Sequence, residues 1–169
     1  MNTFSEAIRQ WETFYLLTGT AAVTLIGLLF IAISINIELF QNKLSTDLQH
    51  FAALTFNCFF YVLVLAILFE VPGISSIGLG TSILVLGSLA TLNTINQQRR
   101  IRKNPNKGTA RNLAKRFTIP MIGLAFMSLL AVGILLQIEI SLYGYIVAII
   151  FLLGSASQNA WSLLMEIKK

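Results

Sequence analysis

The sequence predicts an all-α integral membrane protein with five transmembrane helices, its N-terminus outside and its C-terminus in the cytoplasm. Three observations lead to this fold class. The chain is 56% hydrophobic and only 11% charged, with a mean hydropathy of +0.76, whereas soluble domains contain roughly 25% charged residues. Five long apolar runs are separated by short polar or turn-forming segments. A basic loop divides three of these runs from the other two.

The five runs form a single transmembrane domain, 1–169. The predicted spans are about 14–36, 51–69, 74–95, 117–137 and 142–164. Each is close to the roughly 20 apolar residues that a helix needs to cross the hydrocarbon core. The first run is too long for the apolar region of a signal peptide, so we expect it to remain in the protein as a span.

A short helix is expected before the first span. Thr3 and Glu6 have the spacing of a capping box, in which the two side chains satisfy free amides at a helix start. Ile8, Trp11 and Tyr15 then recur at helical spacing and form one apolar face. Trp11 and Tyr15 also suit the membrane–water interface, where aromatic side chains concentrate.

Span one carries a stripe of small and polar side chains. Its members are Thr20, Thr24, Gly27 and Ser34. Small residues let two helix backbones approach closely inside a membrane. The stripe therefore predicts helix packing, within the bundle or between copies of the chain, or the lining of a pore.

Polar side chains also gather toward the predicted cytoplasmic third of the bundle. The amides among them are Asn57, Asn93, Gln158 and Asn159. An unpaired amide in hydrocarbon is costly, so we expect these side chains to share a hydrogen-bonded network or a wet inward cavity. Between spans two and three, Pro72 and Gly73 predict a tight turn. Ser141 is the expected N-cap of the last span.

The loop over 96–116 contains eight basic residues and no acidic one. They are Arg99, Arg100, Arg102, Lys103, Lys107, Arg111, Lys115 and Arg116. Turn-forming residues occupy 104–108, and Thr109 can cap a new helix. We expect spans three and four to extend past the membrane here as a basic helical hairpin.

The distribution of basic residues predicts the orientation. With the basic hairpin inside, Lys43, Lys168 and Lys169 also face the cytoplasm, and only Arg9 lies outside. Lys and Arg are retained on the cytoplasmic side of membrane proteins. The same rule accounts for the positive net charge, so nucleic acid is not an expected partner, whereas anionic lipid headgroups are.

Motifs for catalysis, cofactors and metals are missing from the sequence. No phosphate-binding loop, dinucleotide fingerprint or nucleophile elbow occurs, and no pair of carboxylates lies within a span. The single histidine, His50, has no second histidine to complete a metal site. Lone Cys58 lies within an apolar run, as expected of a small buried side chain. We therefore expect a protein that is not an enzyme and has no cofactor.

Two segments resemble a group of small bacterial integral membrane proteins of unassigned function. The first covers 11–30, from Trp11-Glu12-Thr13-Phe14-Tyr15 to Leu28-Leu29-Phe30, and the second is Asn159 to Ile167. The resemblance implies a protein of the bacterial inner membrane and no catalytic residues.

Two functional hypotheses follow. In the first, the protein self-assembles into a homo-oligomer and acts as a small channel or pore, because five spans leave little room for a pathway within one protomer. In the second, it is an accessory or regulatory subunit that docks a cytosolic or membrane protein through its basic hairpin.

Overall fold

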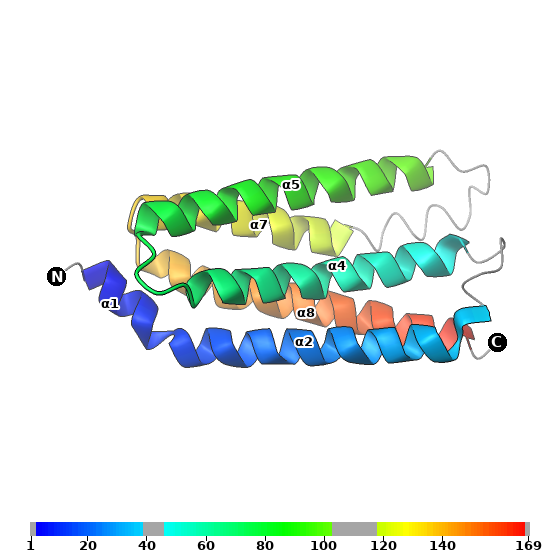
Figure 1. Cartoon of the computed structure of the whole chain (residues 1–169). Helices are drawn as coiled ribbons and strands as arrows, with labels where there is room; N and C mark the ends of the chain where they lie inside the picture. Colours follow the sequence, from blue (N-terminus) through cyan, green and yellow to red (C-terminus); the bar gives the residue numbers. More distant parts are fainter. Residues whose placement is uncertain (1–2, 39–45, 103–117, 168–169) are drawn as a thin grey trace.

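The computed structural model describes residues 3–38, 46–102 and 118–167. This part of the chain forms six helices and contains no strand (Figure 1). The helices are α1 (Thr3–Gln10), α2 (Glu12–Ile35), α4 (Thr46–Phe69), α5 (Ser76–Arg102), α7 (Thr118–Leu135) and α8 (Ile140–Ile167). Five of them are long and apolar enough to cross a membrane, so the predicted all-α class with five candidate spans is confirmed.

The predicted helix before the first span is confirmed as α1, but it does not continue straight into α2. Trp11 interrupts the two helices with φ −96° and ψ 0°, and its amide bonds to the carbonyl oxygen of Ile8 at 3.0 Å. Figure 1 shows α1 set at an angle to α2 at the end of the bundle that carries the N-terminus. We call this the amino-terminal end.

At the same end, the predicted turn at Pro72 and Gly73 joins α4 to α5. Gly73 has φ 71°, a left-handed conformation that glycine adopts without steric cost. Ser75 then caps the start of α5. Its hydroxyl oxygen accepts a hydrogen bond from the amide of Gly78 at 3.0 Å, as in an N-cap. At its other end α5 runs on to Arg102, past the predicted end of span three at Ile95.

A second turn at the amino-terminal end joins α7 to α8. Gln137 has φ 56° and its amide bonds to Ile134, while the amide of Ile138 bonds to Gly133; this is the Schellman pattern that ends many helices. The predicted N-cap role of Ser141 is wrong. The turn already starts α8 at Ile140, and the Ser141 hydroxyl donates to the carbonyl oxygen of Ile138 at 2.6 Å.

The long helices pack side by side in an order that differs from the sequence. From one edge to the other, the main contacts run from α5 to α7, then to α8, α4 and α2. Helices α4 and α5 are consecutive in the chain but contact each other only weakly. Helix α2 lies at the opposite edge and packs chiefly on α4.

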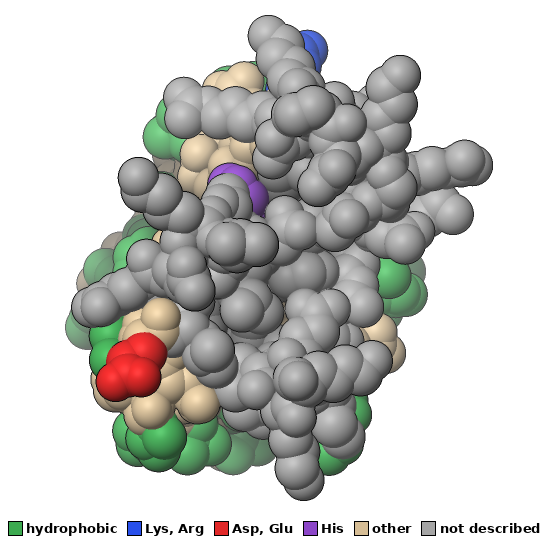
Figure 2. All heavy atoms as spheres, turned by 90° about the vertical axis from the view of Figure 1, so that its right-hand side faces the viewer, with side chains coloured by type: hydrophobic (Ala, Val, Ile, Leu, Met, Phe, Trp, Pro, Cys, Tyr) green, Lys and Arg blue, Asp and Glu red, His purple; other side chains and the backbone are tan. Residues whose placement is uncertain are grey.

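The outer surface of the bundle is apolar, as expected of a surface that faces lipid. Leu17, Ile35, Ile77, Leu129 and Ile150 are among the large hydrophobic side chains that lie exposed along the helices. Figure 2 looks onto the end opposite the amino-terminal end and shows apolar flanks around the rim of the bundle.

Close approaches at glycine bring the helices together. A Cβ added at Gly80 of α5 would lie 2.7 Å from Leu135 Cγ and 3.2 Å from the carbonyl oxygen of Ala131. A Cβ at Gly133 would lie 2.7 Å from Ser141 Cβ, and one at Gly19 would lie 3.0 Å from Ala66 Cβ. Small residues therefore set the spacing of neighbouring helices, as lipid offers no hydrophobic drive for their association.

Substituting Gly80 tests this packing. Gly80→Ala should lower the free energy of unfolding by about 1–3 kcal/mol, because α5 and α7 must separate to admit the methyl group. Gly154→Ala is the matched control, since nothing lies within 4 Å of a Cβ there. Reversible unfolding in mixed detergent micelles measures both variants, and equal stabilities would contradict the assigned contact.

Candidate functional site

The predicted stripe on span one faces outward from the protomer. Thr20, Thr24, Gly27 and Ser34 are all exposed on α2, and nothing lies within 4 Å of a Cβ added at Gly27. The hydroxyl of Thr20 donates to the carbonyl oxygen of Leu16 at 2.8 Å, and that of Thr24 donates to Thr20 at 2.9 Å. These hydroxyls are therefore satisfied by their own helix.

A different face of α2 packs inside the bundle. Its buried residues are Tyr15, Thr18, Gly19, Ala22 and Leu29. Periodicity alone does not distinguish the two faces, because both combine small and apolar residues. The signal that separates them is the aromatic ring of Tyr15, which stacks on Phe69 of α4 with ring centroids 3.8 Å apart.

The predicted amide residues occupy different surroundings. Asn159 is 5% exposed, and its Nδ2 atom has no hydrogen-bond partner within the described ranges. Asn57 is half-buried on α4, whereas Gln158 is exposed on α8. Asn93 of α5 forms a side-chain hydrogen bond with Tyr61 of α4. In the described part of the chain no hydrogen bond joins any two of these four amides, so their shared network stays a prediction.

The predicted basic hairpin lies largely outside the described residues. Arg99 is exposed on α5, and the helix continues through Arg100 to Arg102. Lys103, Lys107, Arg111, Lys115 and Arg116 lie outside the described residues.

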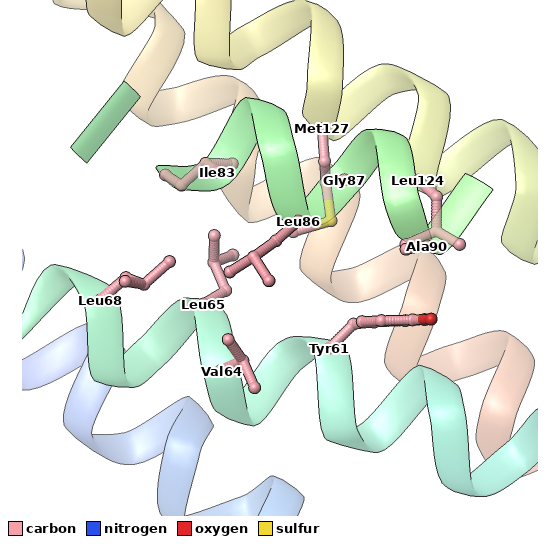
Figure 3. A pocket seen from close by; sticks show the side chains of 10 residues that line it. All are labelled: Tyr61, Val64, Leu65, Leu68, Ile83, Leu86, Gly87, Ala90, Leu124 and Met127. Carbon is pink, nitrogen blue, oxygen red and sulfur yellow. The ribbon is translucent and has the colours of Figure 1, made fainter. Parts of the chain in front are cut away.

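The space between α4 and α5 is apolar and small. Leu65 of α4, Leu86 of α5 and Met127 of α7 line it together with seven other residues (Figure 3). Its volume is about 30 Å³, which is enough for one or two water molecules. This space is therefore too small for a larger solute.

Aromatic side chains meet at the amino-terminal end of the bundle. Their spacing in the sequence did not predict these contacts. Trp11 contacts Tyr143 of α8 edge-to-face at a centroid distance of 5.0 Å. Phe69 contacts Tyr145 in the same way at 5.6 Å while it stacks on Tyr15. The cluster thus joins the junction of α1 and α2 to α4 and α8. Edge-to-face pairs of this kind add to the gain from burial.

Two grooves border this aromatic cluster and share a wall. The first lies along α2 and α4, has a volume of about 530 Å³ and is lined mainly by apolar side chains such as Leu16, Val23 and Ile67. The second lies between α1 and the α4–α5 turn and has a volume of about 470 Å³. Glu70, Val71 and Pro72 line both grooves.

Unpartnered polar atoms lie in these walls. Oε1 of Glu70 and the hydroxyl of Tyr15 are buried, with no hydrogen-bond partner in the part of the chain that the structure describes. Arg9 and Glu12 add charge to the second groove. The sequence pattern predicted no binding role for Glu70. The sequence feature that could have indicated this site is a carboxylate directly after one apolar span, together with Arg9 and Glu12 directly before another.

Metal-ligating side chains do not cluster in the described residues. No group of three or more His, Cys, Asp or Glu side chains lies close enough there to hold a metal ion. Cys58 is buried and free.

The five apolar helices and their apolar flanks define a multi-pass membrane protein. No protein-family model matches the chain, and no curated protein or solved structure matches it either. The resemblance based on 11–30 and 159–167 therefore stays a prediction.

The two buried tyrosines provide a matched test of the aromatic cluster. The Tyr145 hydroxyl donates to the carbonyl oxygen of Met127 at 3.1 Å, whereas the Tyr15 hydroxyl has no partner among the described residues. Tyr145→Phe should therefore lower the free energy of unfolding by about 0.5–1.5 kcal/mol. Tyr15→Phe should lower it less or not at all. Chemical unfolding in detergent compares the two, and a larger loss for Tyr15→Phe would contradict the assigned hydrogen bond.

Proposed function

We propose that the protein resides in a bacterial inner membrane and acts by self-assembly, forming a homo-oligomeric channel whose path lies between protomers. The observation that carries this proposal is the open surface of α2 around Gly27, where nothing lies within 4 Å of an added Cβ. Exposed small residues let a second helix approach closely, and dispersion contacts then hold it there.

The stripe divides into two halves on this surface. Thr20 and Thr24 border the groove along α2 and α4, whereas Gly27 and Ser34 lie further along the exposed face. The contact between protomers is therefore centred on Gly27. The narrow space between α4 and α5 favours a path between protomers over one within a protomer.

Docking through the basic hairpin is the second proposed function. Its support is the length of α5, which continues as a helix to Arg102 and exposes Arg99. A rigid helix that carries basic side chains beyond the apolar stretch could bind an acidic partner as well as anionic headgroups. Reversing the charges of Arg99 and Arg100 should then release the partner without changing the oligomer, provided that the orientation in the membrane is unchanged.

The orientation proposed for the chain places the amino-terminal end outside. Thr3 and Glu139 both belong to that end, so a cysteine at either position should react with an impermeant maleimide added from outside. A cysteine at position 106 should not react. The native thiol of Cys58 is 1% exposed and contributes little background. Outside labelling at position 106 would reverse the orientation.

The self-assembly proposal is tested with Gly27→Leu. The open surface leaves room for the leucine in the protomer, so the fold should persist while the helices of neighbouring protomers separate. Native mass spectrometry from nanodiscs should show at least about a tenfold loss of oligomer, equivalent to 1.4 kcal/mol.

Leu28→Ala is the control for this experiment. Leu28 is 56% exposed beside Gly27, and its truncation introduces no steric block between protomers, so the oligomer should remain. An intact oligomer of folded Gly27→Leu would refute the interface, and a wild-type monomer in nanodiscs would refute the channel.

A further inference from the structure

We propose that the two grooves at the amino-terminal end form one binding site for a membrane phospholipid with a primary ammonium headgroup, of the phosphatidylethanolamine type. The inference requires the protein to span a membrane, but it does not require self-assembly. It rests on the shape of the joined grooves, on the charges in their walls and on the unpartnered oxygen of Glu70.

The joined grooves have one apolar arm and one polar arm. The apolar arm runs along α2 and α4. Leu16, Val23 and Leu63 line it on the side where lipid acyl chains would lie. The polar arm lies at the end of the bundle between α1 and the α4–α5 turn. Glu70 stands where the two arms meet. An amphiphile fits this shape with its tail in the apolar arm and its headgroup in the polar arm.

The polar arm contains charges of both signs. Arg9 supplies a guanidinium group, while Glu12 and Glu70 supply carboxylates. A guanidinium binds a phosphate through two parallel hydrogen bonds, and a carboxylate accepts hydrogen bonds from an ammonium group. A zwitterionic headgroup with both a phosphate and an ammonium therefore complements this arm.

The buried Glu70 oxygen selects among zwitterionic headgroups. Its Oε1 atom has no donor among the residues that the structure describes, and a buried acceptor of this kind gains most from a group that donates a hydrogen bond. A primary ammonium has three N–H donors. A quaternary ammonium, such as that of phosphatidylcholine, has none and can only approach the carboxylate as a bulky charge.

Tyr15 provides a second polar atom along the same path. It is 1% exposed, lines the apolar arm, and its hydroxyl has no partner in the described part of the chain. An acyl ester just below the headgroup carries carbonyl oxygens that accept such a hydroxyl.

The test is lipid retention by the full chain. Nanodiscs contain equal parts of phosphatidylethanolamine, phosphatidylcholine and phosphatidylglycerol with identical acyl chains, and native mass spectrometry counts the lipids that remain bound after extraction. Phosphatidylethanolamine should be retained about fivefold to tenfold over phosphatidylcholine, as expected for a charge-assisted hydrogen bond near the membrane surface. Equal retention of these two lipids by the wild type would overturn the proposal without any variant.

Glu70→Gln keeps the size of the side chain and removes its charge. This variant should reduce the preference for phosphatidylethanolamine to within about twofold. Glu139→Gln is the matched control, because Glu139 is an exposed carboxylate in the other turn at the same end and does not line either groove. Its lipid preference should equal that of the wild type. A preference that survives in Glu70→Gln would overturn the assignment.

Two further variants distinguish a bound phospholipid from other occupants of the grooves. Arg9→Gln should lower the retention of all three phospholipids while preserving the preference between ethanolamine and choline, because the phosphate is common to them. Gly27→Leu should leave lipid retention unchanged even where it dissociates the oligomer. If Glu70→Gln changes the oligomer and leaves bound lipid unchanged, a second copy of the chain occupies the groove and the lipid proposal fails.

Discussion

The constraint on which this structure depends is that hydrocarbon offers no hydrogen-bond partner to a polar group. Every long helix satisfies its backbone internally, and its hydroxyl side chains follow the same rule. The hydroxyls of Thr81, Thr91 and Thr94 bond to carbonyl oxygens of α5 itself. Such bonds let a helix carry threonine at a lipid-facing or packed position without a partner from another helix. The few atoms that break the rule, such as Glu70 Oε1, are therefore informative.

The same constraint changes what holds the helices together. Because lipid is as apolar as a leucine side chain, burial of leucine contributes little, and close contact becomes decisive. Gly80 and Gly133 lie at such contacts, whereas Gly27 and Gly154 have open space around them. The helical glycines Gly80 and Gly133 are therefore completed contacts between helices, whereas Gly27 and Gly154 lie on surfaces still available to one.

The apolar runs predicted the number of long helices, and their ends agree with the structure to within a few residues at most boundaries. They could not predict the lateral order, in which α8 separates α4 from α7. They also could not predict that Gly19 and Ala22 face inward while Thr20 and Gly27 face outward. In a soluble helix, polarity distinguishes these faces, but in a membrane both are apolar. The groove at Glu70 escaped prediction because it joins α1 to a turn far along the chain, and contacts such as the packing of Tyr15 on Phe69 bring them together.

The position of α8 has a consequence for how the protein is made. Helices α2 and α4 leave the ribosome early and pack on each other, and α5 and α7 then form a second pair. Helix α8 contacts both α4 and α7, so it is the element that joins the pairs, and its 28 residues follow both pairs in the chain. At about 5–20 residues per second, α8 is made over a second or more after α7. Until then the faces of α4 and α7 that α8 buries are uncovered, so the bundle is complete only once α8 has been made.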